Sequence, residues 1–338
     1  MAKIYYDSDA DLGALKDKTI VFLGFGNQGA AQAQNLRASG IPNDKIIVAN
    51  RDDHYAADAK SKGFNVEHDF AKAAEVADVL FLLVPDQVQP RIFNGQFSPK
   101  LKDSVTIVVA SGYNVFYNLL HFKASQDVVM VAPRMIGSSV RTLYEKGKGF
   151  PCFISVEQNG SGNALTTTLA LSRAIGATKA GAIASSVREE TAMDLFAEQA
   201  LWPNIIALFR EAYSVLKEVG CSDEALVYEM WMSKEPAEIF EAAAEEGFIE
   251  QLKHHSTVSQ YGQLSGALKI DGTAIRAHFK EILHNQVLNG KFQKEFSKIE
   301  ADLEKEGDEN PINQLYTKSA ESELGQGEKR VRARLGLS

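Results

Sequence analysis

Three glycines near the start of the chain are spaced to bind a dinucleotide. Gly24, Gly26 and Gly29 form a G-x-G-x-x-G motif between an apolar run and a helical segment. In this motif the first glycine makes a tight turn, the second lets the backbone approach a pyrophosphate, and the third lets helix and strand pack closely. An ordinary glycine-rich turn is the alternative. The expected cofactor contacts of the loop are Gly24, Phe25, Gly26, Asn27, Gln28 and Gly29.

The acids after the second apolar run should determine which of two cofactors, NADH or NADPH, is bound. Asp52 and Asp53 follow Arg51 there. A carboxylate accepts hydrogen bonds from the ribose 2′-OH of NADH and repels the 2′-phosphate of NADPH, so the two aspartates favour NADH. NADPH stays open because Arg51 could clamp a 2′-phosphate, stack on the adenine or pair with an aspartate. A solvated turn with incidental charges is a further alternative.

A later pair of carboxylates could hold a metal ion. Asp194 and Glu198 are four residues apart in an apolar helical segment, which puts them on one face. Such a pair repels unless a cation or a proton neutralises it, and ligation by oxygen alone suits Mg²⁺. Acids at this spacing are also common on solvated helices, so the pair alone leaves both interpretations open.

The scaffold expected for the first half is a mostly parallel sheet with helices on both faces. Apolar runs that read as strands cover residues 19–24, 45–50, 79–85, 106–111, 128–133 and 152–157. Amphipathic stretches separate them, and the one after the first run predicts a helix over 28–39. This alternation is typical of a Rossmann-type α/β domain, which we expect over residues 1–183.

The second half changes character, because glycine thins out and apolar residues recur at helical spacing. An all-helical domain is therefore expected over residues 184–338. Its predicted helices cover residues 189–219, 223–233, 236–253, 273–289 and 291–305. Pro203 should kink the first helix. The charged, glycine-punctuated segment 319–338 predicts a partly mobile tail.

Composition narrows the classes of function. A chain of 338 residues with 45% hydrophobic residues can fill two cores. A net charge of −8 argues against a nucleic acid partner. No run of 18 apolar residues predicts a membrane span. Two cysteines, expected to be core residues, and a charged N-terminus without an apolar signal region favour the cytoplasm.

The order of the motifs resembles the short form of the ketol-acid reductoisomerases over nearly the whole chain. The matching segments are Tyr5 to Leu12, Gly24 to Gly40, Pro85 to Gln89, Met130 to Pro133, Asp194 to Gln199, and Ser256 with Gln260 to Gly262. Members of that family are magnesium-dependent enzymes of branched-chain amino acid biosynthesis. The resemblance implies a Rossmann domain followed by an all-α, knotted-type C-terminal domain that entwines with its twin. It thus implies a homodimer with shared active sites, and a higher oligomer stays open.

The resemblance also implies roles for single residues. Asp194 and Glu198 should bind magnesium, and Glu229 and Ser256 should reach the site from the partner subunit. The expected metal ligands are Asp194, Glu198 and Glu229, and the expected substrate contacts are Arg134, Glu229, Ser233 and Ser256. Beyond the glycine loop, the expected cofactor contacts are Arg51, Asp52, Asp53, Pro85, Asp86, Gln89, Ser111 and Gly112.

The chain departs from the family at several of these positions. Ser111 stands where the family has a histidine, and Arg134 stands where it has a lysine. Serine cannot replace imidazole chemistry near neutral pH, and arginine can clamp a carboxylate but cannot give up a proton. Ser233 replaces a second acid on the helix of Glu229. The dinucleotide loop is one residue shorter than the common form, with aspartates in place of serines.

These departures predict a reductase that transfers hydride from NADH to a small 2-oxo acid or imino acid, with isomerisation weakened or lost. The expected catalytic residues are Asp194, Glu198, Arg134, Ser111 and Tyr113, and Mg²⁺ is the expected metal. Structural alternatives remain: Ser111 could cap the next helix, Tyr113 could pack in the core, and Arg134 could pair with Glu198. One alternative function is a genuine, Mg²⁺-dependent ketol-acid reductoisomerase that converts 2-acetolactate to 2,3-dihydroxyisovalerate. Another is a non-catalytic protein that binds NADH as a sensor.

Overall fold

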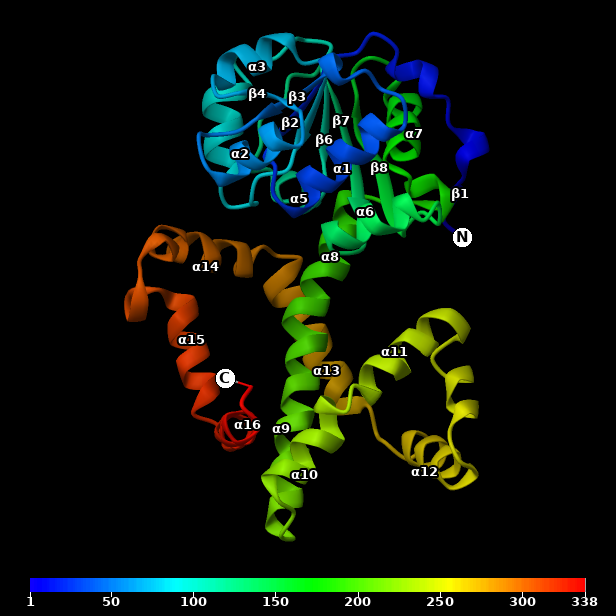
Figure 1. The fold of residues 1–338 in the computed structure, drawn as a ribbon, viewed down its shortest axis with the longest axis vertical. Coiled ribbons are helices and arrows are strands. Elements are labelled where there is room, and N and C mark those ends of the chain that lie inside the picture. The colour runs from blue at the N-terminus through cyan, green and yellow to red at the C-terminus, as the bar shows by residue number, and fades with distance from the viewer. Residues whose placement is uncertain (338) are drawn as a thin grey trace. The chain divides into compact units, whose positions relative to one another are not determined.

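The computed structural model describes residues 1–337, apart from the side chain of Glu304. The chain divides into two compact units, Met1–Asp194 (unit 1) and the residues from Leu195 onward (unit 2). Figure 1 traces the elements of both units. Within residues 1–337, every helix falls short of the length and apolar character needed to cross a membrane.

Unit 1 is built on one sheet, which has nine strands among the described residues. They are β1 (Ile4–Tyr5), β2 (Ile20–Leu23), β3 (Ile46–Ala49), β4 (Asn65–Glu67), β5 (Val79–Leu82), β6 (Thr106–Val109), β7 (Asp127–Pro133), β8 (Cys152–Asn159) and β9 (Ala182–Ala184). The run β4-β3-β2-β5-β6-β7 is parallel throughout, which is the strand order of a dinucleotide-binding Rossmann fold. β8 pairs antiparallel with β7, and β9 and then β1 extend the sheet beyond it.

Both faces of the sheet are buried. Ile20 and Phe22 of β2 belong to one apolar cluster, whereas Val21 and Leu23 of the same strand belong to another. Phe22 also stacks on Phe81 of β5 with ring centroids 4.5 Å apart. Side chains of a strand alternate between the faces, so these near-continuous apolar strands must be covered on both sides.

Helices of unit 1 provide that cover. They are α1 (Asn27–Ala38), α2 (His54–Ser61), α3 (Phe70–Val76), α4 (Gln89–Ile92), α5 (Tyr113–Phe116), α6 (Gly137–Glu145), α7 (Ala164–Ile175) and α8 (Val187–Phe196). α1 contacts α6 and α7, and α7 contacts β7 and β8, on the face of the first cluster. Residues of α3 belong to the second cluster, on the opposite face. The mixed sheet with helices on both faces confirms the predicted fold class.

Unit 2 is helical in its described part. Its helices are α9 (Trp202–Glu218), α10 (Asp223–Val227), α11 (Glu235–Glu246), α12 (Thr257–Ala267), α13 (Thr273–Ile282), α14 (Lys291–Ile299), α15 (Pro311–Ala320) and α16 (Glu323–Arg334). The buried apolar cluster of this unit comprises Tyr213, Leu226, Val227 and Val331. This is a small core for so many helices.

One aspartate ties three of these helices together. Asp223 accepts a hydrogen bond from the Tyr213 hydroxyl at 2.5 Å, and the Lys217 ammonium lies 2.8 Å from the same carboxylate oxygen. Its other oxygen accepts from Arg330 of α16 at 2.9 and 2.7 Å. The carboxylate therefore links α9, α10 and α16.

The structure differs from the sequence prediction in unit 2. The predicted helix over 189–219 is present as α8, a π-helical turn at Ala197–Leu201 and α9, and Pro203 lies in the first turn of α9, directly after the π-helical turn. The sequence does not predict α12 or α15. Within the segment 319–337, for which a partly mobile tail is predicted, α16 covers Glu323–Arg334 and buries Val331.

Candidate active site

The glycine motif lies where β2 ends and α1 begins. Gly24 has φ of +100°, which L side chains rarely adopt, and Gly26 is the N-cap of α1. A Cβ on Gly29 would lie 2.3 Å from the carbonyl oxygen of Gly24, so only glycine allows this packing. A Cβ on Gly26 would meet no described atom within 4 Å. This open space beside the first turn of α1 fits the approach of a pyrophosphate.

Two other residues of the loop also have structural partners. The ring of Phe25 is buried and packs edge-on against Phe64, with centroids 5.5 Å apart. The side chain of Gln28 donates to the carbonyl of Met135 at 2.8 Å. Asn27 is exposed at the start of α1. Of these three side chains, Asn27 is the one left facing solvent at the helix N-terminus.

The two aspartates after β3 have different surroundings. Asp53 caps α2, since its Oδ1 accepts the N–H groups of Tyr55 and Ala56 at 2.9 and 3.1 Å. Arg51 donates to its Oδ2 at 2.8 Å, so the pairing alternative for Arg51 is present. Burial raises the pKa of Asp53, but the bonds from Arg51 and the two amides outweigh it and hold the pKa below its usual value. The side chain of Asp52 is 89% exposed, with Nε2 of His68 4.0 Å from its Oδ1, and is the more accessible of the two carboxylates.

Arg134, which follows β7, binds two carboxylates of α8. Its Nη1 donates to Oε1 of Glu190 at 2.7 Å, and its Nη2 donates to Oδ1 of Asp194 at 2.6 Å. Glu190 is only 2% exposed, and its Oε2 accepts the N–H of Gly112 at 2.8 Å. The sequence alternative for Arg134 names a different acid, Glu198.

The pKa shifts of Arg134 and Glu190 follow from burial and from the charges around them. Burial would lower the pKa of Arg134, but Asp194 and Glu190 raise it above its usual value, so the guanidinium is a permanent cation. Burial raises the pKa of Glu190, the Gly112 amide and Arg134 oppose this, and the net shift is upward. One fixed positive charge thus faces two carboxylates.

Ser111 and Gly112 connect this cluster to α5. A Cβ on Gly112 would lie 2.6 Å from the carbonyl oxygen of Val187, so glycine is required for the close approach of α8. The Ser111 hydroxyl oxygen accepts the N–H of Tyr113 at 3.3 Å, but the N-cap of α5 is Gly112, so Ser111 lies one position before the cap. The ring of Tyr113 packs against Tyr117 with centroids 5.0 Å apart, but the residue is half-buried and lies outside the two apolar clusters of unit 1.

Asp86 lies in the loop after β5, next to the glycine loop at the point where the strand order reverses. Gln89 donates to its Oδ1 at 3.1 Å, and Asn114 donates to its carbonyl oxygen at 2.9 Å. Burial raises the pKa of Asp86 to about 6, with a bond from Ser111 opposing the shift and the charge of Asp194 adding to it. Pro85, beside it, is exposed.

The remaining predicted residues belong to unit 2. Glu198 lies in the π-helical turn Ala197–Leu201, and exposed Glu229 lies in another at Tyr228–Met232. Such turns often mark functional sites. Ser233 follows the second turn, and Ser256 is the N-cap of α12. Unit 1 therefore brings together Arg134, Ser111, Gly112, Asp86 and Asp194, whereas Glu198, Glu229, Ser233 and Ser256 stand in unit 2.

The predicted magnesium ligands come from both units: Asp194 ends unit 1, whereas Glu198 and Glu229 lie in unit 2. Among residues 1–337, no three His, Cys, Asp or Glu side chains converge in a way that could hold a metal ion. Asp194 is instead bound by Arg134. Arg134 thus occupies an oxygen of Asp194 that the implied magnesium site would need, and this pairing does not fit that site, so no catalytic step is derived through a metal.

Sequence reasoning missed Glu190. It is the most deeply buried acid of the cluster and joins Arg134 to the backbone of Gly112. The signal is present, because Glu190, Asp194 and Glu198 follow one another at intervals of four, and the first two already share a helical face.

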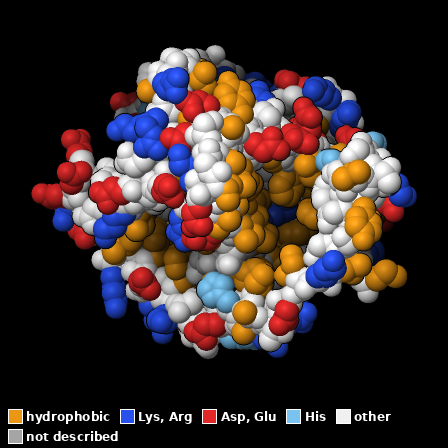
Figure 2. Space-filling model, turned by 90° about the horizontal axis from the view of Figure 1, so that it is seen from below, with side chains coloured by type: hydrophobic (Ala, Val, Ile, Leu, Met, Phe, Trp, Pro, Cys, Tyr) orange, Lys and Arg blue, Asp and Glu red, His pale blue; other side chains and the backbone are white. Residues whose placement is uncertain are grey.

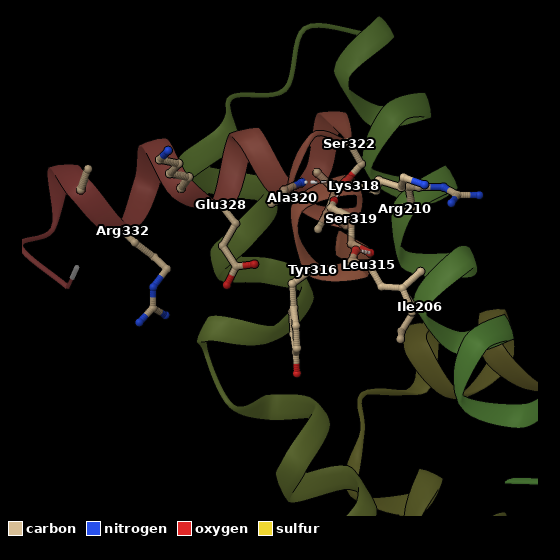
Figure 3. A pocket seen from close by; sticks show the side chains of 14 residues that line it. Ile206, Arg210, Leu315, Tyr316, Lys318, Ser319, Ala320, Ser322, Glu328 and Arg332 are labelled. Atoms are coloured by element: carbon tan, nitrogen blue, oxygen red, sulfur yellow. Dashed lines mark hydrogen bonds between the residues drawn. The ribbon is translucent and has the colours of Figure 1, made fainter. Parts of the chain in front are cut away.

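A groove of about 920 Å³ lies elsewhere, in unit 2. Its walls come from α9, α15 and α16, with Ile206, Arg210, Leu315 and Tyr316 among the side chains shown in Figure 3. None of the residues predicted to bind cofactor, metal or substrate lines this groove. It is therefore not the candidate active site.

Comparison with models of known protein families shows to which family this chain belongs. Residues 14–181 match the family model "Acetohydroxy acid isomeroreductase, NADPH-binding domain", and residues 187–336 match "Ketol-acid reductoisomerase, C-terminal domain". The chain belongs to the ketol-acid reductoisomerase family. It is thus an NAD(P)-dependent oxidoreductase with a nicotinamide cofactor domain, as the resemblance implies.

Individual relatives agree with this placement. The chain is 36% identical to the putative ketol-acid reductoisomerase 3 of Saccharolobus solfataricus, over 96% of this chain and 95% of that one. It is 39% identical to a ketol-acid reductoisomerase (NADP(+)) of Sulfurisphaera tokodaii, over 88% of each. The structure of an NADH-preferring ketol-acid reductoisomerase from an uncultured archaeon matches with a TM-score of 0.85 and 31% identity, over 98% of each chain. These names favour the reductoisomerase alternative over the divergent reductase.

Proposed function

We propose that this chain is a ketol-acid reductoisomerase. It moves the methyl group on C2 of 2-acetolactate to the neighbouring C3 and then reduces the resulting 2-oxo acid with hydride from a nicotinamide cofactor. The hydride goes to C2 and a proton to its oxygen, giving 2,3-dihydroxyisovalerate. The observation that carries this proposal is that both halves of the chain match the family and that relatives of this name align over nearly its full length.

A second candidate is a reductase without the alkyl shift. Arg134 and Ser111 favour it, because they stand in place of the lysine and histidine of the family and Arg134 is already bound to Asp194. The shift requires removal of a proton from a tertiary alcohol and strong polarisation of two oxygens. Hydride transfer requires only an oriented carbonyl, a bound nicotinamide and a proton source. The substrate would then be a small 2-oxo or imino acid.

Product analysis separates these candidates. Full-length protein is incubated with 2-acetolactate, NADH and Mg²⁺, and the product is identified by NMR. A reductoisomerase gives 2,3-dihydroxyisovalerate, in which both methyl groups are on C3. Reduction without migration gives 2,3-dihydroxy-2-methylbutanoate, in which the methyl groups lie on C2 and C3. The second product as the main one, or no reaction of 2-acetolactate while small 2-oxo acids are reduced, would refute the reductoisomerase proposal.

We further propose that the enzyme prefers NADH. The exposed carboxylate of Asp52 supports this, since it can accept bonds from a ribose 2′-OH and would repel a 2′-phosphate. The pyrophosphate would lie at Gly26, where the backbone leaves space. Arg134 uses two of its five N–H donors on Glu190 and Asp194, which leaves three for a substrate carboxylate.

We also propose a homodimer. Unit 2 exposes large apolar side chains, such as Leu208 (67%), Val219 (76%) and Leu268 (89%). Figure 2 shows hydrophobic side chains among the charged ones on one face of the molecule. Exposed apolar surface on this scale marks an interaction surface, and the resemblance makes a second copy its occupant. Light scattering of full-length protein at micromolar concentration should give at least twice the monomer mass.

The domain boundary is proposed near residues 183 and 184. The interval between the two family matches, residues 182–186, supports this position, whereas the compact units of the structure divide after Asp194.

A further inference from the structure

We propose that the guanidinium of Arg134 is a built-in cation of the active site, which binds both Glu190 and Asp194, offsets one of their two negative charges, and thereby disfavours a divalent metal ion at Asp194. The inference rests on the proposed function, because it concerns the acids expected to take part in the family reaction. The resemblance implies that Asp194 binds magnesium. The inference differs from this expectation, and it names the Arg134 side chain as the cause of the difference.

The geometry of the Arg134 guanidinium, with its two terminal nitrogens on two different acids, supports this assignment. Nη1 and Nη2 of Arg134 each reach a different carboxylate, at 2.7 and 2.6 Å. Glu190 has both oxygens engaged, one by Arg134 and one by the N–H of Gly112 at 2.8 Å. The short distances are typical of charge-assisted hydrogen bonds. A planar guanidinium can bridge two acids in this way, whereas a lysine ammonium is a single point charge on a flexible stem.

The cation is also held in place by its surroundings. The N–H of Arg134 donates to the carbonyl of Pro151 at 2.9 Å, which fixes the backbone at the end of β7. The guanidinium carbon lies 5.2 Å from the ring centroid of Phe153, so the ring face adds to its stabilisation. The side chain is 28% exposed, and Glu190 is nearly inaccessible. Moving Arg134 aside to admit an ion would strand a buried carboxylate, which is costly.

Charge explains the expected effect on metal binding. A divalent ion bound to Asp194 would lie close to a permanent positive charge that bonds to the same carboxylate. Like charges at this separation repel strongly where water is partly excluded. The ion would therefore have to compete with Arg134 for Asp194. Removal of the guanidinium should release that carboxylate and raise its affinity for a divalent ion.

The test is Mn²⁺ binding to full-length protein, followed by the EPR signal of free Mn²⁺ and without substrate. R134M should bind Mn²⁺ roughly tenfold or more tightly than the wild type, because the competing charge is gone. The gain should vanish in the double variant R134M/D194N. R141M is the matched control: Arg141 pairs with Glu145 at 2.9 Å, its side chain is 27% exposed, and its removal changes the net charge equally. R141M should leave Mn²⁺ affinity unchanged.

R134K provides a second variant in case R134M does not fold. Lysine keeps the charge but cannot bridge both acids, so R134K should show a smaller gain in Mn²⁺ affinity than R134M and still exceed the wild type. Wild-type protein that binds Mn²⁺ as tightly as these variants would overturn the inference. Failure of the proposed function is distinguishable, because it appears as missing turnover, whereas this measurement reports metal affinity without any reaction.

Discussion

The two units of this chain differ in how completely they bury their apolar side chains. Unit 1 buries apolar residues on both faces of its sheet, with Phe22 and Phe81 completely inaccessible. Unit 2 has a small buried cluster around Tyr213 and leaves residues such as Leu268 exposed. Unit 1 has the core of an independent domain, and its acids are fixed by buried contacts. Unit 2 instead presents Glu229 and Ser256 on an exposed surface, which agrees with the proposal of a second copy.

The largest effect is expected from removing the buried acid of unit 1. E190A leaves Arg134 short of one partner and the N–H of Gly112 without an acceptor. It should lower the free energy of unfolding of unit 1 by about 3 kcal/mol. Urea denaturation measures this change. E189A, at the exposed neighbouring position, should change stability by less than about 0.5 kcal/mol. Equal effects of the two variants would show that the cluster does not stabilise unit 1.

Close packing in unit 1 is tested by adding a single methyl group. G29A places a Cβ 2.3 Å from a carbonyl oxygen and should cost about 2 kcal/mol of stability and abolish NADH binding. G26A adds its methyl group in open space, so the melting temperature should stay within a few degrees while NADH binding weakens. Calorimetry and cofactor fluorescence give the two readouts. Normal NADH affinity in G26A would exclude the pyrophosphate from this position.

In unit 2 we expect stability to depend more on pH than on side-chain packing. The bonds from Lys217 and Tyr213 lead in holding the pKa of Asp223 below its usual value, against burial, and Arg330 adds to them. A carboxyl with a lowered folded pKa contributes stability above its unfolded pKa, and this is lost as pH falls through the folded value. D223N should therefore cost about 1 kcal/mol at pH 7 and progressively less below about pH 4.

Urea denaturation of D223N at pH 7 and pH 3, compared with the wild type, checks this dependence. D308N, at an exposed aspartate of the same unit, is the control and should show no such trend. A constant cost of D223N across this range would contradict the account of the three-helix link.

The smallest effect concerns cofactor choice. D52S removes the exposed carboxylate that is expected to repel a 2′-phosphate. The ratio of kcat/KM for NADPH to that for NADH should rise several-fold, with little change in stability. D53S should behave differently, because it also removes the cap of α2 and should lower stability by about 1 kcal/mol. An unchanged ratio in D52S would remove Asp52 from the cofactor site.

The sequence predicts unit 1 better than unit 2, for a physical reason. The long apolar runs of buried strands are strong signals, and all six become strands, although β8 runs antiparallel. The strands β1, β4 and β9 are too short to carry a pattern. In unit 2, α12 has no buried residue and α16 buries Gly327 and Val331, so neither helix presents a run of buried apolar positions to the sequence reader.

The candidate site was accessible to sequence reasoning only in part. Glycine spacing and acids at helical intervals reveal the cofactor loop and Asp194. The partners of Arg134 depend on how β7 and α8 meet, which no local pattern specifies. The π-helical turns around Glu198 and Glu229 are likewise invisible in the residue types. The residue roles at the site and the cytoplasmic location stay predictions.

The most direct test of the central claim is NADH oxidation by the full-length protein with 2-acetolactate, compared with NADH oxidation with 3-hydroxy-3-methyl-2-oxobutanoate. This 2-oxo acid is the rearranged form of 2-acetolactate and requires hydride transfer alone. The account predicts turnover of both acids that is saturable in acid and in NADH. Tight NADH binding without oxidation of NADH, with this acid or with 2-acetolactate, would contradict the account and favour a non-catalytic NADH sensor.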